Sequence, residues 1–393
     1  MLPLAGITVI TLEHAIAAPF ATRQLADLGA RVVKIERPDV GDFARGYDER
    51  VRGLASHFVW TNRSKESLTL DVKHPEAQVI LKRLVQEQAD VVVQNLAPGA
   101  ASRLGLSYEA LSPGKPGLIV CDISGYGADG PYRDKKAYDL LIQSESGLLS
   151  VTGTADEPSK AGPSIADIAA GMYAYSSILA ALLHRQKTGL GQRLDISMLE
   201  SLVEWMSYPL YYAFDGAAPP PRTGASHATI YPYGPFPAGD GKTVMLGLQN
   251  EREWGAFCDK VLLRPELSKE PRFSSNSKRS AERNDLRRMI VEVFSTLTTE
   301  EVLRRLDDAQ IANAQVNEMR DVWQHPQLRA RDRWRDVDSP SGKIPALLPP
   351  GSWDTETPRM DGIPALGQHT DAILSSLGYS AAAIADLRKA QAI

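Results

Sequence analysis

Two kinds of periodicity alternate at the start of the chain. Residues 7–12 form a β-branched apolar run, residues 19–28 show helical spacing, and residues 31–35 are β-branched again after Gly29. A strand, a helix and a strand in this order predict a βαβ unit, in which the two strands lie parallel in one sheet. This feature directs the chain toward an α/β fold.

The same alternation continues through the first third of the chain. Residues 91–93 and 118–123 are short apolar runs typical of buried strands. Residues 75–88 precede them and place five apolar side chains on one helical face, namely Ala77, Ile80, Leu81, Leu84 and Val85. Strands that alternate with helices predict a mostly parallel, Rossmann-like sheet.

The length and the prolines indicate how the chain is divided. It has 393 residues, more than the roughly 250–300 at which single hydrophobic cores stop growing, so two domains are expected. The triplet Pro219-Pro220-Pro221 can continue neither helix nor sheet and predicts a linker. Further prolines at 340–350 predict a second linker. The region between them is expected to be a smaller α+β unit, in which Thr298 and Glu301 form a capping-box pattern.

Charge and cysteine content exclude several classes of protein. The net charge of −4 comes from 44 basic and 48 acidic residues mixed along the sequence, so no nucleic-acid partner is expected. Only Cys121 and Cys258 are present, which supports neither a disulfide framework nor a zinc site and fits a reducing compartment. With no basic leader and no apolar run near the ~20 residues that span a bilayer, the protein is expected to be cytoplasmic, without a membrane partner.

The familiar catalytic motifs are absent from the sequence. The seven histidines lack the i+2 to i+4 spacing of a metal-binding helix, so no metal site is expected. Neither a Gly-x-Ser-x-Gly elbow nor a Gly-x-x-x-x-Gly-Lys-Ser/Thr phosphate loop occurs. Residues 14–19, after the first strand, lack the three glycines that bring a dinucleotide close to a helix. Hydrolase, nucleotide triphosphatase and nicotinamide-dependent functions therefore lose their usual support.

One carboxylate stands in an unusual setting. Asp167 interrupts a stretch of small and apolar residues, 164–171, at the start of a helix predicted over residues 164–186. An acid in a first helical turn can cap free N–H groups and complement the helix dipole, a stabilisation of about 0.3–1 kcal/mol. The same helix end can keep a nucleophilic carboxylate ionised and offer N–H donors to an oxyanion. Local sequence leaves both interpretations open.

Short motifs in a fixed order extend over nearly the full length. They include the runs at residues 3–7, 18–21, 25–30, 33–38, 62–65, 70–73, 95–99, 124–127, 188–192 and 366–370, together with Gly41-Asp42 and Tyr138-Asp139. In this order and spacing the motifs resemble those of the class III CoA-transferases, the family of formyl-CoA transferase and carnitine CoA-transferase. The resemblance implies an enzyme that moves coenzyme A (CoA) from one carboxylic acid to another.

The fold implied by this resemblance is α/β, with a Rossmann-like large domain around a mostly parallel sheet and a smaller α+β domain. The large domain would comprise residues 1–214 and 341–393, the small domain residues 225–330, and the linkers residues 215–224 and 331–340. Two subunits would thread through each other as an interlocked homodimer. The resemblance implies no cofactor beyond CoA itself, which is a substrate.

By the same resemblance, Asp167 is the catalytic nucleophile. The CoA contacts carry over onto eight residues, which are Arg37, Leu70, Lys73, Asn95, Leu96, Arg103, Leu104 and Lys136. Basic side chains in this set can hold the CoA phosphates, while aliphatic ones can sandwich the adenine. Ile16 stands where formyl-CoA transferase has a glutamine near the reacting carbonyl. Help for the acyl oxygen is therefore expected from backbone N–H groups near Ala17 and Ala18.

Two other functions remain open at this point. α-Methylacyl-CoA racemases share the fold but need a His-Asp pair where this chain has Tyr138-Asp139, and a tyrosine with an unperturbed pKa of ~10 is a poor base near neutral pH. A CoA-binding protein without catalysis is the third interpretation, and retention of Asp167 argues against it. CoA transfer is therefore the expected function, with a racemase or other acyl-CoA isomerase as the alternative.

The segment from residue 14 to residue 45 indicates the substrates. It is similar to family members that use succinyl-CoA with small dicarboxylates or hydroxydicarboxylates, such as itaconate, mesaconate, malate, citramalate or glutarate. The distal carboxylate of such an acceptor needs a cation, for which Arg45, Arg222 and His227 are the candidates. Ile16, Ala17 and Tyr138 are expected to lie beside the substrate.

Overall fold

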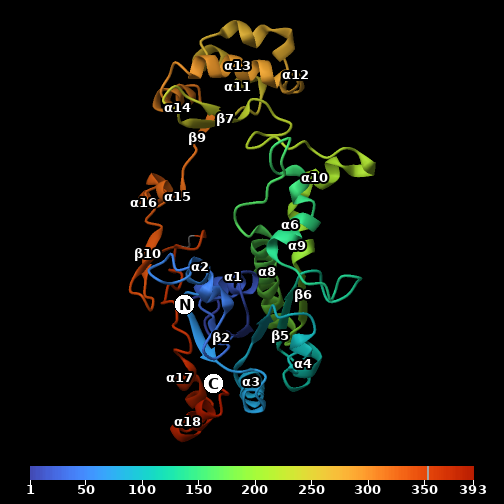
Figure 1. The fold of residues 1–393 in the computed structure, drawn as a ribbon, viewed down its shortest axis with the longest axis vertical. Helices are drawn as coiled ribbons and strands as arrows, with labels where there is room; N and C mark the ends of the chain where they lie inside the picture. Colours follow the sequence, from blue (N-terminus) through green and yellow to red (C-terminus); the bar gives the residue numbers. More distant parts are fainter. Residues whose placement is uncertain (352–353) are drawn as a thin grey trace. The chain divides into compact units, whose positions relative to one another are not determined.

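The computed structural model describes residues 1–351 and 354–393, and the chain forms two compact units (Figure 1). The large unit comprises Met1–Gly147, Ala161–Ser207 and Leu328–Ile393. The small unit comprises Leu148–Lys160 and Tyr208–Gln327. Each unit is built around buried hydrophobic clusters of its own.

A parallel sheet forms the centre of the large unit. Its strands are β1 (Thr8–Leu12), β2 (Arg31–Glu36), β3 (Lys65–Thr69), β4 (Val91–Gln94), β5 (Ile119–Ser124) and β6 (Arg193–Ser197). They lie in the order β3-β2-β1-β4-β5-β6, and every neighbouring pair is parallel. The mostly parallel α/β sheet expected from the sequence is confirmed. Sequence periodicity misses β3 and β6, because these outer strands carry polar residues at several positions.

Helices cover both faces of this sheet (Figure 1). One face packs against α1 (Ala17–Asp27), α6 (Asp139–Glu145), α8 (Ile165–Thr188) and α9 (Met198–Trp205). The opposite face packs against α3 (Pro75–Gln88), α4 (Ala100–Arg103), α5 (Tyr108–Leu111), α17 (Thr370–Ser376) and α18 (Ala381–Lys389). Successive strand residues alternate between the faces, so Val9 lies in one core and Ile10 in the other.

The strand order reverses between β1 and β4, which creates a switch point at their carboxyl ends. Ligands of open α/β sheets bind at such points. The loops that follow the two strands are tied together here. The Asn95 side chain accepts a hydrogen bond from the His14 N–H and donates one to the His14 carbonyl oxygen, both at 2.9 Å. The loop between β1 and α1 is thereby fixed at the edge where a site is expected.

Helix α8 corrects one expectation from the sequence. By length and composition its 24 residues could cross a membrane, although no run of that kind was expected. In the structure it packs along α1 and against β5 and β6, with the small residues Ala166, Ala170 and Ala174 in the core. It is therefore a core helix of the large unit. It ends, as predicted, at a glycine, Gly189, whose φ of 76° is left-handed.

A hairpin occupies part of the chain that was expected to be a linker. Strand β10 (Trp334–Val337) lies inside the predicted linker at 331–340 and pairs antiparallel with β11 (Ile344–Leu347) in the large unit. Pro345 is tolerated in β11 because a two-stranded sheet leaves one edge of each strand unpaired. The prolines of this region therefore do not all mark a linker.

The small unit begins earlier than predicted, at Tyr208 rather than residue 225, and also takes Leu148–Lys160. Its antiparallel sheet has the order β7-β8-β9, formed by Tyr233–Pro237, Thr243–Gly247 and Ala312–Gln315. Its helices include α11 (Glu251–Ala256), α12 (Asn276–Ala281), α13 (Arg283–Phe294) and α14 (Thr299–Asp308). One half of the predicted capping box of α14 is present, because the Thr298 hydroxyl accepts the Glu301 N–H at 3.2 Å, while the Glu301 side chain pairs with Arg305.

Shorter helical segments complete the chain. They are η1 (Phe43–Gly46), α2 (Ser56–Thr61), η2 (Ser112–Gly114), α7 (Leu148–Val151), α10 (Ser207–Tyr212), η3 (Phe214–Gly216), η4 (Phe257–Val261), η5 (Pro265–Lys269), η6 (Pro271–Phe273), α15 (Met319–Val322) and α16 (Pro326–Ala330). Of these, η1 and α2 follow β2 and approach the β1–α1 loop, so they bear directly on the site.

Candidate active site

The first turn of α8 is capped by Asp139 rather than by Asp167. One carboxylate oxygen of Asp139 accepts a hydrogen bond from the Ala166 N–H at 2.8 Å. The other accepts one from the Gln143 side chain at 2.7 Å. Asp139 therefore supplies the cap of this N–H group, while Asp167 remains the acid in the first turn at the positive end of α8.

The Asp167 carboxylate is left without a polar partner. Within residues 1–351 and 354–393 it makes no hydrogen bond or ion pair, and its side chain is half-buried. Burial raises the pKa of Asp167 to about 7, and the charge of Asp139 adds to the rise. The positive end of α8 acts in the opposite direction and favours the ionised form. An unpaired carboxyl with a pKa near neutrality suits a nucleophile or an acid–base catalyst.

Helices α1 and α8 pack against each other in the large unit. A Cβ atom added to Gly171 would lie 2.7 Å from the carbonyl oxygen of Ala17, the first residue of α1. Further along, burial and the charge of Asp27, the last residue of α1, raise the pKa of Tyr175. Both helices therefore begin at the same edge. Asp167, one turn before Gly171 on the same face of α8, lies beside the start of α1.

The start of α1 offers hydrogen-bond donors next to Asp167. The N–H groups of Ala17 and Ala18 have no acceptor within the helix, and no residue that the structure describes accepts a hydrogen bond from them. These donors and the positive ends of two helices can stabilise negative charge that develops on an acyl oxygen. Ile16, at the N-cap of α1, is buried and adds an apolar side chain.

One tyrosine, Tyr47, lies within electrostatic reach of Asp167. Burial raises the pKa of Tyr47 to about 12, with further contributions from Asp42, Asp167 and Tyr138. The Tyr47 phenol therefore stays protonated at neutral pH and can donate a hydrogen bond to a reacting carboxylate. Tyr138, which was expected beside the substrate, directly precedes α6 and is 70% exposed. Tyr47 was missed in the sequence, where nothing distinguishes it from other tyrosines.

Buried charges support the β1–α1 loop, and sequence reasoning missed them as a group. Glu13, Lys34, Asp42 and Lys65 are all buried. Lys34 Nζ lies 2.7 Å from Asp42 Oδ2 and 3.3 Å from Glu13 Oε1. Lys65 Nζ lies 2.6 Å from the same Glu13 oxygen. Burial alone would raise the pKa of both carboxyls, but the lysines outweigh it, and both pKa values lie below their usual range.

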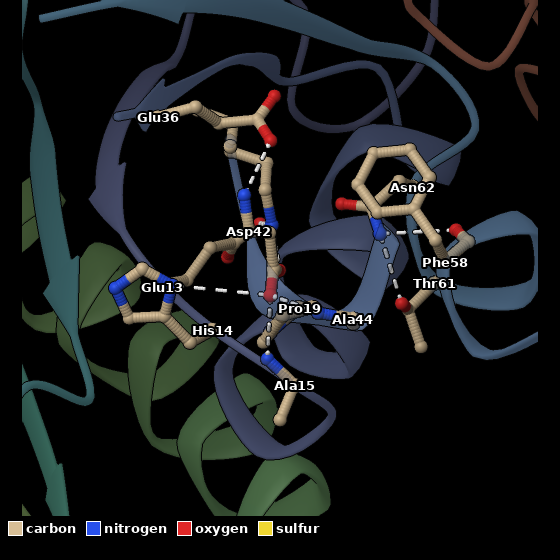
Figure 2. A network of polar contacts seen from close by, with 12 residues as sticks. Glu13, His14, Ala15, Pro19, Glu36, Asp42, Ala44, Phe58, Thr61 and Asn62 are labelled. Carbon is tan, nitrogen blue, oxygen red and sulfur yellow. Dashed lines mark hydrogen bonds and ion pairs between the residues drawn. The ribbon is translucent and has the colours of Figure 1, made fainter. Parts of the chain in front are cut away.

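These charges hold the loop at both of its ends. Figure 2 shows the Asp42 carboxylate beside Ala15, whose N–H donates a hydrogen bond to it at 3.2 Å. At the other end, Lys65 Nζ donates to the Pro19 carbonyl oxygen at 3.0 Å. Ala15 has a φ of 61°, in the left-handed region, which costs a non-glycine residue about 1–3 kcal/mol. The loop is therefore held in a conformation that it would not adopt alone.

The predicted CoA contacts all follow carboxyl ends of strands, the edge that also carries Asp167. Four of them are exposed cations that can meet phosphates, namely Arg37, Lys73, Arg103 and Lys136. Leu96 and Leu104 are partly buried against the core. Leu70 is fully buried, so its side chain cannot sandwich an adenine in this structure. The Asn95 amide is occupied by His14, which makes it a link between loops.

A pocket of about 400 Å³ opens at this edge, within the size range of small-molecule sites. Its lining includes Leu96, Gly99 and Ser124, which follow or end strands β4 and β5. It also includes Arg193, whose Nε lies 3.0 Å from Asp122 Oδ2. The pocket places Leu96, one of the predicted contacts, on a surface that a ligand can reach.

The cations expected to bind an acceptor carboxylate already have partners. Arg45 pairs with both oxygens of Glu36, with N···O distances of 2.8 and 2.7 Å. Its guanidinium holds the loop after β2 and is not free for a substrate. In the small unit, His227 Nδ1 accepts the Ile230 N–H at 3.0 Å, and Arg222 donates to carbonyl oxygens at 154 and 155. Arg45 is therefore paired with a carboxylate, whereas Arg222 and His227 make their hydrogen bonds to backbone groups and a threonine of the small unit.

Other side chains with reactive chemistry are not gathered into a site. Among residues 1–351 and 354–393, no group of three His, Cys, Asp or Glu side chains is arranged to hold a metal ion. Cys121 and Cys258 are buried and form no disulfide. Burial raises the pKa of Cys258 to about 12, so its thiol stays protonated at neutral pH. Among these groups, Asp167 is the candidate nucleophile that the structure favours.

Known proteins resemble this chain along almost its whole length. The human succinyl-CoA:glutarate CoA-transferase is 33% identical over 99% of this chain and 89% of its own length. The succinyl-CoA:mesaconate CoA-transferase of Haloarcula hispanica is 33% identical over 95% of this chain and 96% of its own. A solved CAIB/BAIF family protein from Brucella suis has a TM-score of 0.85 at 33% identity, covering 96% of this chain and 99% of its own. The model of CoA-transferase family III matches residues 4–370, and the chain belongs to that family.

Proposed function

We propose that this protein transfers CoA from an acyl-CoA donor to a carboxylic acid and that Asp167 is the covalent carrier. The observation that carries the proposal is an unpaired, half-buried carboxylate beside free N–H groups at the start of α1. Membership of CoA-transferase family III supports the class of reaction. No cofactor beyond CoA is proposed.

The reaction has four steps. The Asp167 carboxylate attacks the donor thioester carbonyl, the C–S bond breaks, and a mixed anhydride and CoA thiolate result. The thiolate attacks the aspartyl carbonyl, which releases the donor acid and leaves an aspartyl-CoA thioester. The acceptor carboxylate attacks this thioester, giving a second anhydride and CoA thiolate. The thiolate then attacks the acceptor carbonyl, which releases acceptor-CoA and restores the Asp167 carboxylate.

The chain's own groups have separate parts in these steps. The N–H groups of Ala17 and Ala18 stabilise the oxyanion that forms at each attack. The Tyr47 phenol donates a hydrogen bond to a carboxylate that enters or leaves. Buried apolar surface at Ile16 and Ala17 helps to exclude water, which would hydrolyse the anhydride or the thioester. The covalent carrier conserves the free energy of the thioester, so no ATP is needed.

We propose succinyl-CoA as donor and a small dicarboxylate as acceptor, with glutarate and mesaconate as the first candidates. The support is that relatives at 33% identity are named for succinyl-CoA with glutarate and with mesaconate. The pairing of Arg45 with Glu36 removes Arg45 from the proposed acceptor contacts. The dicarboxylate class therefore rests on the relatives and on residues 14–45 rather than on an identified cation.

We also propose that two copies form an interlocked homodimer. Large apolar side chains are exposed along the run from Trp205 to Phe214, among them Tyr211 at 77% and Phe214 at 76%. Exposed apolar patches of this kind are typical of subunit interfaces. The cytoplasm is the proposed compartment, since its reducing conditions suit the free thiols of Cys121 and Cys258.

A substrate panel tests the proposed reaction. The purified protein is incubated with succinyl-CoA and a series of mono- and dicarboxylates, and new CoA thioesters are identified by mass spectrometry. Formation of glutaryl-CoA or mesaconyl-CoA with release of succinate is the expected result. A clear preference for monocarboxylates would refute the substrate class. Solvent deuterium at the α-carbon of a methylacyl-CoA, without any CoA exchange between acids, would establish a racemase instead.

A further inference from the structure

We infer that Asp42 is a positioning residue for the reaction. Together with Lys34 it fixes the backbone of residues 15–18, so that the N–H groups of Ala17 and Ala18 lie beside Asp167. The catalytic consequence rests on the proposed function. The positioning itself does not, because it can be measured on the protein without a substrate.

Both oxygens of Asp42 are engaged with groups on different elements. Oδ1 accepts the N–H of Ala15 at 3.2 Å and the N–H of Ala44 at 2.9 Å. Oδ2 accepts a hydrogen bond from Lys34 Nζ at 2.7 Å. Because Lys34 belongs to β2, this carboxylate links the central sheet directly to the loop before α1. Asp42 is completely buried, so water cannot replace a partner that is lost.

The backbone beside Asp42 shows what the link holds in place. Ala15 has a left-handed φ of 61°, two residues before Ala17. Such conformations persist where surrounding contacts over-determine them, and they cluster at active sites. If Asp42 no longer accepts the Ala15 N–H, the backbone at Ala15 lowers its free energy by relaxing to a negative φ. That change would turn the peptide planes of residues 16–18 away from Asp167.

Stability alone does not explain a charged link at this point. Three buried carboxylates, Glu13, Glu36 and Asp42, face the buried Lys34 and Lys65 and the half-buried Arg45. A buried ion pair is often no more stabilising than apolar residues of similar volume, and removing one partner of such a pair is strongly destabilising. Charged hydrogen bonds add geometric specificity, because their short distances and fixed angles allow the loop only one arrangement.

The neighbouring histidine is a more distant partner of Asp42. His14 Nδ1 lies 3.8 Å from Asp42 Oδ1, beyond hydrogen-bond distance but within reach of an ion pair when the ring is protonated. The His14 ring instead stacks on Phe43, with ring centroids 5.0 Å apart. The short contacts of Asp42 are to backbone N–H groups and to Lys34. They therefore assign it to the loop rather than to the orientation of the imidazole.

Asp27 provides a matched control. It is buried like Asp42, and each of its oxygens lies 2.8 Å from a guanidinium nitrogen of Arg63. Arg23 also contacts it, at 2.9 Å. It stands at the opposite end of α1 from Ala17. Asp42→Asn and Asp27→Asn each remove one buried charge and leave cations behind, but only the first lies at the loop.

The test compares these two variants in the full-length protein. Amide hydrogen exchange is measured over residues 14–20 without substrate. The rate of single-turnover acylation by succinyl-CoA and the dissociation constant for free CoA are measured separately. We expect Asp42→Asn to speed exchange at residues 14–20 at least about tenfold and to slow acylation about 100-fold, the cost of a misplacement of about 1 Å. In Asp42→Asn the dissociation constant for CoA should change less than about twofold. Asp27→Asn should lose a similar amount of stability but keep exchange at residues 14–20 and the acylation rate near the wild-type values.

Unchanged exchange at residues 14–20 in Asp42→Asn would overturn the inference, as would equal losses of acylation rate in the two variants. If the wild type transfers no CoA, the proposed function fails, while the exchange comparison still decides the positioning. Should Asp42→Asn not fold, Lys34→Met/Asp42→Leu replaces the pair with apolar residues of similar size. This variant should regain stability but keep fast exchange and slow acylation. Full recovery of both would refute the role of Asp42.

Discussion

Asp139 accepts a hydrogen bond from the Ala166 N–H at 2.8 Å and so caps the helix whose first turn carries Asp167. The cap leaves the Asp167 carboxylate free of polar partners. It also places a second negative charge nearby, which contributes to the raised pKa of Asp167. Two carboxylates at one helix end thus have different roles, because their surroundings differ.

Replacing Asp139 separates its two effects. Asp139→Asn keeps an oxygen that can accept the Ala166 N–H but removes the charge and the acceptor for Gln143, so the pKa of Asp167 should fall at some cost in stability. Asp139→Ala removes the cap as well and should cost about 1 kcal/mol of unfolding free energy. Denaturant unfolding and the pH dependence of acylation measure the two effects. Equal stability of both variants would show that this hydrogen bond does not stabilise α8.

The raised pKa of Asp167 makes folding stability depend on pH. The carboxyl has a pKa of 3.8 before folding and about 7 in the folded protein, so the folded state binds more protons between these values. Stability contributed by this group therefore falls as pH rises through that window, and the full cost is present above about pH 7.

Asp167→Asn removes this cost. The difference in unfolding free energy between the variant and the wild type should be larger at about pH 8 than at about pH 5. The increase should be on the order of 2 kcal/mol in favour of the variant. Denaturant unfolding of both proteins at the two pH values measures the difference. The same gain at both values would mean that the pKa of Asp167 is not raised.

The contact between α8 and α1 depends on Gly171. A Cβ atom there would lie 2.7 Å from the Ala17 carbonyl oxygen, so Gly171→Ala must push the helices apart. We expect a loss of about 1–3 kcal/mol of stability, from overpacking, and a fall in kcat of at least about tenfold. Gly255→Ala in α11 is the control, since its Cβ meets no atom within 4 Å. It should leave kcat unchanged; a fall in both variants would show that the contact at Gly171 is not specific to the site.

A histidine at position 138 should not create a racemase. Both oxygens of Asp139 already accept hydrogen bonds, from Ala166 and from Gln143, and these bonds hold the carboxylate at the start of α8 rather than toward an imidazole at position 138. Tyr138→His should therefore exchange no α-proton of a methylacyl-CoA with deuterated solvent above background, as measured by mass spectrometry. Exchange that appears in Tyr138→His and vanishes in Tyr138→His/Asp139→Asn would contradict this reading of Asp139.

The central part of the fold follows from the sequence, because its strands are buried on both faces. Runs 91–93 and 118–123 are almost entirely apolar, with Asp122 as their one polar position, and match β4 and β5 closely. The hairpin of β10 and β11 was mistaken for a linker, since Pro345 forbids an inner strand but not one in a two-stranded sheet. Local pattern cannot show which edge of a strand stays unpaired.

The site was predictable only in part, and for a similar reason. Asp167 stands out because it interrupts an apolar helix start, yet the sequence could not show that Asp139 supplies the cap. The buried charges did leave a signal. Lys34 and Glu36 alternate with β-branched residues in β2, and charges on one face of a buried strand require partners. Those partners, Glu13 and Asp42 among them, come from other elements, and only the fold brings them together.

The most direct measurement is mass spectrometry of the peptide that carries Asp167, after incubation of the protein with succinyl-CoA and hydroxylamine. Hydroxylamine converts an aspartyl anhydride or thioester to a hydroxamate. The account predicts this modification on Asp167, none on Asp139, and no CoA transfer by Asp167→Ala. An unmodified Asp167 in a protein that turns over, with an Asp167→Ala variant that still transfers CoA, would contradict it.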